Sequence, residues 1–409
     1  MSSFLNLRFA LLGLLYPLLV FPQAGHLDSV AATRLNGFHH QVAFTFRPAF
    51  VMPTVSFFDG TDQRRLSIKR SWSGHLSYSF GFPDGSLGSR VFSDTYQGIG
   101  VSYFDFGNRL ELGSPLAAYM FQRSRITRIN SRMSLDYEWN FGLSAGWQPY
   151  DPITNPNNII VGSKVNAYLN AGVHLRWQFL RRWAVVGGME ATHFSNGNTE
   201  FPNAGLNTLG VKMGVLYDFL PSEPDEFDQR SATVPLEFPK HVSYDLVVFG
   251  SWKRTGVDFF GTQVASPYKY AVVGAYFAPM YNFGYRFRAG VSLDAIYDGS
   301  ANVYTEDYIV GTDQPFFTPG KDRQVALGTS IRGEYVMPIF TISLGLGANI
   351  FHKGGDLKGT YQAIALKVRV TKNAFLHIGH NLKDFREPNY LMLGVGYRFA
   401  NRTPSLLTK

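Results

Sequence analysis

MSLDYEWNFGLSAGW, the stretch at residues 133–147, decides the fold. Its odd-numbered positions, from Met133 to Trp147, are all apolar or aromatic, whereas its even-numbered positions are polar, charged or glycine. Successive side chains of a β-strand point to opposite faces, so this period of two predicts a strand with one wholly apolar face. Strands of soluble sheets are usually about 5 to 6 residues long, whereas a strand that crosses a membrane needs about 9 to 11. The stretch is long enough for the second kind.

The same alternation recurs at residues 165–179 and 391–399, again with the apolar side chains at odd positions. Long strands with an apolar outer face, a polar inner face and aromatic residues toward their ends are typical of a transmembrane β-barrel. Closure of such a barrel leaves no unpaired strand edge in the lipid. A large soluble β-sandwich is the alternative, but it would have to bury the aromatic-rich face of every strand at once. We therefore expect an all-β, antiparallel transmembrane β-barrel.

Segments of this kind predict about sixteen strands in all. One wide barrel is the main expectation, and two eight-stranded barrels in tandem are the alternative. The Pro-containing, acidic stretch at 221–241 divides the strands eight and eight, and it either joins two small barrels or lies beneath one wide one. With both chain ends in the periplasm, the long links fall outside the cell and the short turns fall in the periplasm. The expected strands are 41–49, 72–82, 95–106, 114–124, 132–147, 164–179, 182–196, 206–220, 242–253, 268–281, 285–298, 323–336, 338–351, 360–371, 374–383 and 389–399.

The remaining segments complete the expected domain organisation. Residues 1–24 are expected to be an export signal, because a basic residue precedes the apolar run at 9–21 and small residues follow it. Its cleavage point is left open. The first barrel half is expected at 25–220, the second at 242–399, and a C-terminal tail at 400–409.

The composition excludes several classes of protein. The 409 residues contain no cysteine, 45% apolar and 17% charged residues, so the chain is too apolar to be disordered and has neither disulfides nor a lipoprotein anchor. Apart from the N-terminal run, no stretch approaches the roughly 18 to 20 apolar residues of a membrane-spanning helix. The net charge is +8, but Lys and Arg are scattered singly, which argues against nucleic-acid binding. An exported chain of this kind is expected in the bacterial outer membrane.

Three polar side chains interrupt the apolar face near one hairpin. His193 and Ser195 end the odd, outward face of the strand at 182–196, and Asn207 begins that face on the next strand. A hairpin centred near residue 200 places Asn207 opposite His193. The three side chains are then expected together on the outer surface, at the extracellular end of the barrel and level with the outer leaflet.

A serine beside a histidine is the minimal nucleophile and general base for acyl transfer, provided that a third group orients the imidazole and donors meet the oxyanion. Asn207 can orient His193 through its side-chain carbonyl, and Asn196 and Asn203 supply amide donors nearby. Residues two apart on a flat strand lie roughly 6 to 7 Å apart. A hydrogen bond between Ser195 and His193 is therefore expected to need a bulge or a sharp twist.

The runs HFSNG at 193–197 and PNAGLN at 202–207, followed by an alternating strand, resemble the signature of the PagL-like lipid A 3-O-deacylases. That family consists of outer-membrane barrels whose active site faces the lipid and hydrolyses an ester-linked acyl chain of lipid A. The resemblance implies that Ser195 is the nucleophile and that His193 is the general base.

The resemblance also implies that Asn203, together with Asn196, donates to the oxyanion. Two features depart from the family pattern. The acidic member of the triad falls on Asn207, an amide, which can hold the histidine tautomer but cannot stabilise imidazolium by charge. Glu200 in the connecting loop is an alternative acid, whereas the parity of Glu190 places it in the lumen. The family barrel has about eight strands, and this chain carries a second set.

The second half contains a sequence echo of this hairpin at residues 375–399. When its Pro-Asn pair is aligned with that of the first half, Gly379 and Asn381 occupy the places of the histidine and the serine, so no second active site is expected. His377 and His380 are expected on opposite faces of one strand, where they do not share a metal.

The adopted interpretation is a hydrolase: Ser195, activated by His193, attacks an acyl ester of lipid A, and water then releases the fatty acid. Neither a cofactor nor a metal is expected. The expected partners are the membrane and the lipid A of lipopolysaccharide in its outer leaflet, and association of two copies is left open. A non-catalytic porin or envelope scaffold with a relic active site is the alternative, and acyl transfer to another lipid is a third hypothesis.

Overall fold

The computed structural model describes most of the chain after its N-terminal segment. The expected signal at 1–24 and the acidic residues 221–235 lie outside the described part. No helix within the described part is long and apolar enough to span a membrane. The described residues are 37–60, 67–219, 236–254, 256–259, 262–306, 315–385 and 387–407.

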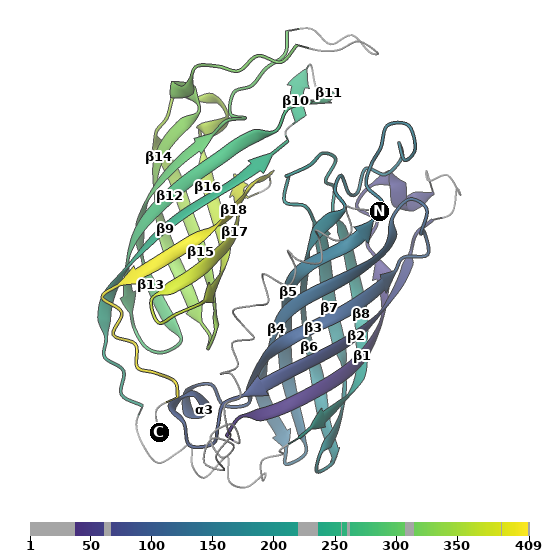
Figure 1. Ribbon diagram of the computed structural model, residues 1–409, viewed down its shortest axis with the longest axis vertical. Coiled ribbons are helices and arrows are strands. Elements are labelled where there is room, and N and C mark those ends of the chain that lie inside the picture. Colours follow the sequence, from purple (N-terminus) through teal and green to yellow (C-terminus); the bar gives the residue numbers. More distant parts are fainter. Residues whose placement is uncertain are drawn as a thin grey trace, which may run out of the picture.

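The barrel strands form two closed antiparallel barrels of eight strands each (Figure 1). The first barrel closes where its first strand pairs with its eighth, with Gln41 opposite Asp218. The second closes in the same way, with Gly250 opposite Leu393. The main expectation of one wide barrel is therefore wrong, and the tandem alternative is confirmed. The alternation along a strand is the same in both architectures, so it does not reveal which strand edges join.

The first barrel contains every strand expected before residue 221, and its β4 is longer than predicted. Its strands are β1 (His39–Val51), β2 (Arg70–Gly81), β3 (Thr95–Asp105), β4 (Gly113–Asn130), β5 (Met133–Trp147), β6 (Val165–Leu180), β7 (Trp183–Ser195) and β8 (Leu206–Asp218). Two short helical segments lie in its links, η2 (Ser56–Asp59) and α3 (Leu87–Val91).

The second barrel follows the same up-and-down order, with a small two-stranded sheet in its first long link. Its barrel strands are β9 (His241–Lys253), β12 (Tyr270–Asn282), β13 (Phe287–Asp298), β14 (Val325–Val336), β15 (Phe340–Phe351), β16 (Thr360–Arg369), β17 (Ala374–Lys383) and β18 (Glu387–Phe399). The small elements are β10 (Gly256–Phe259), β11 (Thr262–Ala265), η3 (Lys321–Arg323) and η4 (Gly355–Leu357).

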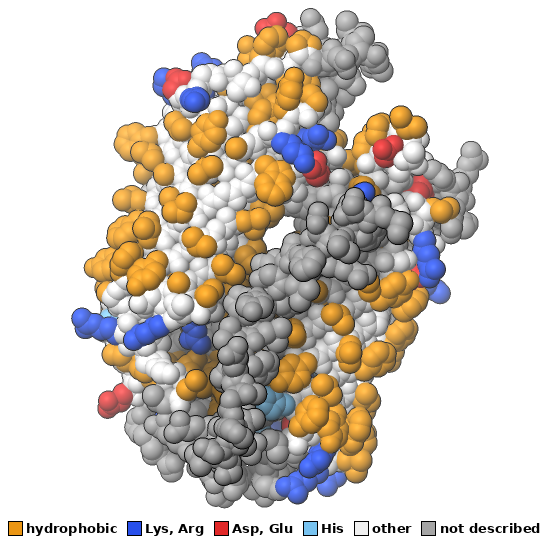
Figure 2. Space-filling view, in the orientation of Figure 1, with side chains coloured by type: hydrophobic (Ala, Val, Ile, Leu, Met, Phe, Trp, Pro, Cys, Tyr) orange, Lys and Arg blue, Asp and Glu red, His pale blue; other side chains and the backbone are white. Residues whose placement is uncertain are grey.

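Apolar side chains cover the outer faces of both barrels, and many of the charged side chains lie toward the barrel ends (Figure 2). Leu76 and Val101 of the first barrel and Leu293 and Ile331 of the second are all more than half exposed. A surface of this size and polarity is not stable in water. Both barrels therefore present an outer face suited to hydrocarbon, as the alternation predicts.

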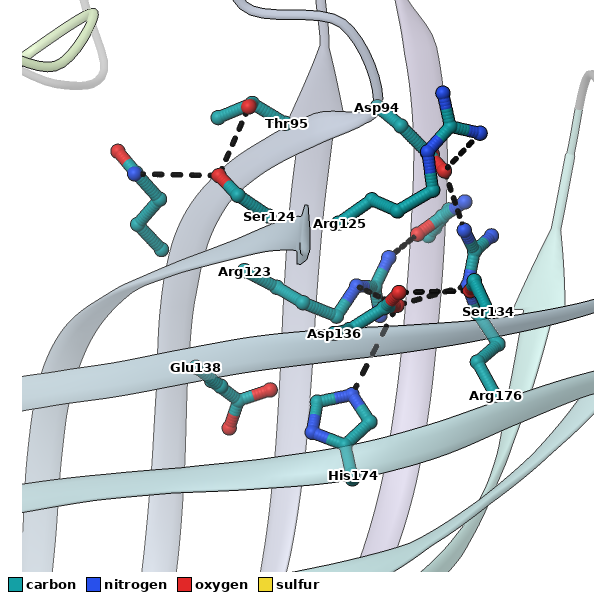
Figure 3. A network of polar contacts seen from close by, with 12 residues as sticks. Asp94, Thr95, Arg123, Ser124, Arg125, Ser134, Asp136, Glu138, His174 and Arg176 are labelled. Atoms are coloured by element: carbon teal, nitrogen blue, oxygen red, sulfur yellow. Dashed lines mark hydrogen bonds and ion pairs between the residues drawn. The ribbon is translucent and has the colours of Figure 1, made fainter. Parts of the chain in front are cut away.

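Side chains fill the interior of the first barrel. Toward the loop end, aromatic rings pack together: Phe194 is fully buried, with its ring centroid 5.0 Å from those of Phe104 and Trp147. Toward the turn end, Arg176 bridges two carboxylates, at 2.9 Å from Asp136 and 2.5 Å from Asp94 (Figure 3). An eight-stranded barrel is just wide enough for such side chains, so this interior is a packed core rather than a pore.

Between these layers lies a second group of ion pairs. The Arg47 guanidinium lies 2.7 Å from Glu190 and 3.3 Å from Glu138, and Lys212 lies 2.6 Å from Glu138. Glu190 therefore faces the lumen, as its parity predicts. Each buried charge has an opposite charge beside it, which offsets the cost of removing it from water.

The second barrel is filled in the same manner. Asp245 lies 2.8 Å from Lys367 and 2.7 Å from Arg398, and Arg288 lies 2.7 Å from Glu334. Asp245, Lys367, Arg288 and Glu334 are almost wholly buried in the lumen, and Arg398 is half-buried. Buried ion pairs therefore occupy the lumen of the second barrel as they do that of the first.

Candidate functional site

The outer face of β7 carries the two residues expected to react. Its burial pattern alternates, so that Thr192 and Phe194 are buried in the lumen while His193 and Ser195 are half-buried on the outside. The pairing of β7 with β8 places Asn207 directly opposite His193. The predicted register is therefore confirmed, and the polar interruption lies where β7 ends and the β7–β8 loop begins.

A hydrogen bond orients the imidazole. His193 Nδ1 lies 2.7 Å from Asn207 Oδ1. An amide oxygen only accepts hydrogen bonds, so Nδ1 carries the proton and Nε2 keeps its lone pair. The histidine is thereby held in the tautomer that a general base requires.

Ser195 follows in a regular strand. It lies opposite Ala167 of β6, just as His193 lies opposite Leu169, and the β6–β7 register shifts only at the other end, between Gln178 and Leu180. The expected bulge is therefore absent from the described strand, and among the described contacts no hydrogen bond joins Ser195 to His193. The two side chains share one face at neighbouring places, and catalytic hydrogen bonds are often long in enzymes without substrate.

The aromatic core of the first barrel anchors the site from within. Phe194 stands between the two outward residues in sequence and packs among Phe104, Trp147 and Tyr168 in the lumen. Because neighbouring side chains of a strand point to opposite faces, this packing fixes the outward direction of His193 and Ser195.

The two asparagines expected to stabilise an oxyanion bind each other in the loop. Asn203 Oδ1 accepts a hydrogen bond from the Asn196 backbone N–H at 3.0 Å. Asn203 Nδ2 donates to Asn198 Oδ1, and Asn196 Nδ2 donates to the Glu200 carbonyl, both at 3.0 Å. A primary amide has two N–H groups, so each side chain has a second one to offer. Asn196 is buried and Asn203 is half-buried, which leaves Asn203 the more accessible donor.

The Glu200 carboxylate binds cations of the second half of the chain. It forms an ion pair with Lys269 and lies 3.8 Å from the Arg254 guanidinium. His193 Nδ1 is meanwhile occupied by Asn207. The structure therefore brings Asn207, and not the Glu200 carboxylate, to the imidazole.

Two glycines let the loop pack closely. Gly205 has a φ of +74°, and a Cβ there would lie 3.2 Å from the His193 ring. Gly197 has a φ of +64°, and a Cβ there would lie 2.4 Å from Leu391 of β18. A left-handed backbone and these close approaches both favour glycine. The loop of the first barrel is thus shaped on one side by its own histidine and on the other by the second barrel.

The sequence did not predict that the second barrel contacts the β7–β8 loop. The Asn198 side chain donates a 2.7 Å hydrogen bond to the Pro388 carbonyl, and Leu391 packs on Gly197. No local pattern could have indicated these contacts, because they join segments nearly two hundred residues apart in the chain.

Two family models match the chain. Residues 72–215 match the family model described as lipid A 3-O-deacylase (PagL), and residues 242–402 match the one described as acyloxyacyl hydrolase, C-terminal domain. The chain belongs to the PagL family. The match to PagL includes His193, Ser195 and Asn207, and the match to the C-terminal domain covers the second barrel. Members of the PagL family are ester hydrolases of the bacterial outer membrane that deacylate lipid A, and this chain is one of them.

Three solved structures are among those similar to this PagL family member. Neisserial surface protein A is 9% identical, with a TM-score of 0.29, and the match covers 45% of this chain and 98% of that one. The FrpB iron transporter from Neisseria meningitidis is 10% identical, with a TM-score of 0.22, over 88% of this chain and 70% of that one. The siderophore receptor PirA from Pseudomonas aeruginosa is 8% identical, with the same TM-score, over 88% and 80%. No curated protein matches the chain.

Proposed function

We propose that this protein is a serine hydrolase that removes an ester-linked acyl chain from lipid A, with Ser195 as nucleophile, His193 as general base and Asn207 as the residue that orients it. The hydrogen bond of 2.7 Å between His193 Nδ1 and Asn207 Oδ1 carries this proposal. On a lipid-facing surface such a pair has no structural need, because a polar group there lacks water partners. The family description favours the ester at a 3-position as the scissile bond.

In the first step, Ser195 Oγ attacks the ester carbonyl carbon while its proton moves to His193 Nε2. Rotation of the serine side chain brings Oγ toward the imidazole, since both residues share one face of β7. Asn207 keeps the resulting imidazolium in place through the same hydrogen bond. It offers a dipole rather than a full negative charge, so it stabilises the imidazolium less than a carboxylate would.

The negative charge on the carbonyl oxygen needs donors nearby. Asn203, which is half-buried beside the end of β7, supplies its second amide N–H, and Asn196 is the further donor. One donor aimed at an oxyanion typically contributes about 10²-fold to 10³-fold in kcat. The loop hydrogen bonds between these two asparagines keep both amides positioned before the substrate arrives.

Collapse of the tetrahedral intermediate breaks the ester C–O bond, and His193 returns its proton to the departing hydroxyl of the sugar. The acyl chain then remains on Ser195 as an ester. Water attacks this ester with His193 again as base, and the fatty acid leaves with Ser195 restored. These steps involve only this chain, the lipid and water.

The packed interiors argue against a porin. Ion pairs and aromatic rings fill both lumens where the strands are described, so the polar interior that would suit a channel is occupied. Acyl transfer to a second lipid uses the same first step and differs only in the acceptor. Its product would be a heavier lipid instead of a free fatty acid.

Mass spectrometry of lipid A from cells that express the wild type or Ser195→Ala tests the proposal. We expect the wild type to remove one acyl chain and Ser195→Ala to remove none. Ser163→Ala is the matched control, because Ser163 lies in the neighbouring loop, where its hydroxyl donates a hydrogen bond to the Val165 carbonyl. It should act like the wild type. Identical lipid A from wild type and Ser195→Ala, with both barrels folded by gel migration, would overturn the assignment of the nucleophile.

A further inference from the structure

Two basic side chains lie next to each other on the outside of the second barrel. The last pair of the β9–β12 ladder is Lys253 opposite Tyr270. The next residues, Arg254 and Lys269, therefore lie side by side just beyond the end of the ladder. Lys253 points into the lumen, where its ammonium group lies 2.9 Å from Asp298. Because successive side chains of a strand alternate between its faces, the basic pair of Arg254 and Lys269 faces outward.

The Glu200 carboxylate of the first barrel holds this basic pair but balances only one of its two charges. It forms an ion pair with Lys269 and lies 3.8 Å from the Arg254 guanidinium. These contacts with the other barrel place both basic side chains outside the lumen of the second. One carboxylate beside two cations leaves a net positive charge at this point of the rim.

Both basic side chains keep hydrogen-bond donors for another ligand. An ammonium group has three N–H donors and a guanidinium has five. Among the described contacts, the Arg254 side chain donates one hydrogen bond, to the Pro267 carbonyl at 3.1 Å, and the Lys269 side chain donates one, to the Glu200 carboxylate. The side chains of Lys269 and Arg254 are 50% and 32% exposed. A second anion therefore has donors to bind without displacing Glu200.

The basic pair lies at the height of the lipid headgroups. Trp252, the outward residue of β9 that precedes Arg254, is 51% exposed and lies opposite Ala271 of β12. Aromatic girdles of this kind mark the two interfaces of a transmembrane barrel. Arg254 and Lys269 stand one outward place beyond this tryptophan, so they lie on the polar side of the interface.

Backbone contacts fasten the basic pair to the loop that carries the candidate site. The Arg254 backbone N–H donates to the Asn198 carbonyl at 3.1 Å, and the Asn198 side chain accepts a hydrogen bond from Asn203. Asn198 follows Ser195 by three residues, so their backbones lie at most about 11 Å apart. A lipid whose ester is bound at Ser195 therefore has its headgroup beside the basic pair.

We infer that Arg254 and Lys269 bind a phosphate group on the glucosamine headgroup of lipid A, and that they make the enzyme prefer phosphorylated lipid A. The inference rests on the proposed function, because it takes the scissile ester to lie at Ser195. Phosphate fits this site, since a guanidinium and an ammonium group both form charge-assisted hydrogen bonds with its oxygens. The second barrel then contributes to substrate specificity without carrying the nucleophile.

Variants that remove one charge test this inference. We expect Lys269→Gln and Arg254→Gln each to lower, by about threefold or more, the ratio of kcat/KM for bisphosphorylated lipid A to that for the same lipid A after removal of its phosphates. The change should lie in KM, with kcat within about twofold of the wild type, because the basic pair binds the headgroup and not the ester. About 1 M salt should lower the ratio of the wild type as well, since it screens the charges.

Lys353→Gln is the matched control. Lys353 is also an exposed lysine paired with a carboxylate, that of Asp322, and it lies in a different link of the second barrel. Its removal should leave the ratio unchanged. An unchanged ratio in Lys269→Gln and Arg254→Gln, with Ser195→Ala inactive on both substrates, overturns the phosphate site and leaves the nucleophile in place.

Hydrolysis of either substrate by Ser195→Ala would remove the nucleophile instead, and binding alone then judges the basic pair. The wild type in detergent micelles should bind an ether-linked, non-hydrolysable lipid A analogue more tightly with its phosphates than without them. Lys269→Gln should reduce this preference by about threefold or more. Equally tight binding of phosphatidylglycerol, reduced to the same degree in Lys269→Gln, would mean a general anionic-lipid surface and would overturn the inference.

Discussion

The two barrels of this chain share one architecture but present different chemistry at the same hairpin. In the first barrel, the outward pair at the rim is His193 opposite Asn207, with Ser195 two residues further on. In the second barrel, the corresponding outward pair is His380 opposite Leu391. The Leu391 side chain cannot form a hydrogen bond to orient His380, whereas the Asn207 side chain orients His193. The difference lies in two side chains, the residue opposite the histidine and the serine two places after it, and both hairpins keep the same fold.

The alignment of the two hairpins on their Pro-Asn pairs gives a different correspondence from the one in the structure. Aligned on their Pro-Asn pairs, Gly379 and Asn381 fall where the histidine and serine should be, but both face the lumen. There Asn381 Oδ1 accepts a 3.1 Å hydrogen bond from Asn389. The pairing of β17 with β18 shifts between Asn381 and Leu382, and such an irregularity changes which residues share a face. His377 also faces the lumen, opposite in direction to His380 as predicted.

We infer from this comparison that the second barrel supplies apolar packing contacts to the first, whereas the first carries the proposed catalytic residues. Leu391 of the second barrel packs on the β7–β8 loop, and Phe340 of the same barrel packs on Trp139 of the first. Such a role needs apolar contacts in the right places rather than a reactive residue. Three further experiments test this division of roles.

The largest effect is expected where the barrels differ most. Asn207→Ala removes the group that holds the His193 tautomer, and we expect kcat on lipid A to fall by about 10²-fold or more. Asn207→Asp restores a charge beside the imidazole, and it should raise kcat by up to about tenfold. Steady-state kinetics in detergent micelles measures both. Thr208→Ala, on the lumen side of the same strand, is the control, and a decrease in kcat for Asn207→Asp would contradict the assigned role.

An intermediate effect is expected where the second barrel touches the catalytic loop. Gly197→Ala forces a side chain onto a left-handed backbone and against Leu391. We expect unfolding in urea, followed by tryptophan fluorescence, to become easier by about 1 kcal/mol or more. Adding Leu391→Ala should restore the stability that is lost to the clash with Leu391, but not the stability that is lost to the strained backbone.

Gly187→Ala is the matched control for that substitution. Gly187 lies on β7, before the loop that contains Gly197, and nothing lies within 4 Å of the place a Cβ would take. It should have little effect on stability. Equal losses for Gly187→Ala and Gly197→Ala would show that contact with the second barrel is unimportant for this loop.

The smallest effect is expected at the ion pairs of the rim. Glu200→Gln removes the partner of Lys269 and Arg254, and exposed pairs contribute only about 0 to 1 kcal/mol. We expect a small loss of stability that disappears at about 1 M salt, where the Debye length is about 3 Å. Deacylase activity should remain within about twofold of wild type, since Asn207 orients His193.

Asp322→Asn is the control for the salt effect, because its pair with Lys353 is exposed and lies within the second barrel alone. A loss of activity of about 10²-fold for Glu200→Gln would instead indicate that Glu200 supplies the acid. Comparing this activity with that of Asn207→Ala then shows which residue orients His193.

Much of the β7–β8 hairpin, which carries the candidate site, was predictable from the sequence, because it is a short-range feature. Once the hairpin is centred near residue 200, the alternation fixes which side chains face outward and which partner stands opposite His193. The distance between Ser195 and His193 was harder to predict. A regular strand separates the two residues, and the expected bulge does not occur in β7.

The sequence by itself determined the strands, the face that meets lipid and the pairing of His193 with Asn207, since each follows from backbone geometry over a few residues. Only the tertiary structure decided that β8 returns to β1, so that two narrow barrels form, and that the second barrel lies against the β7–β8 loop. The physical reason is range. Alternation is a property of neighbouring residues, whereas barrel closure and the contact between the barrels depend on which distant surfaces fit together. The same period of two along the strands is compatible with one wide barrel and with two narrow ones.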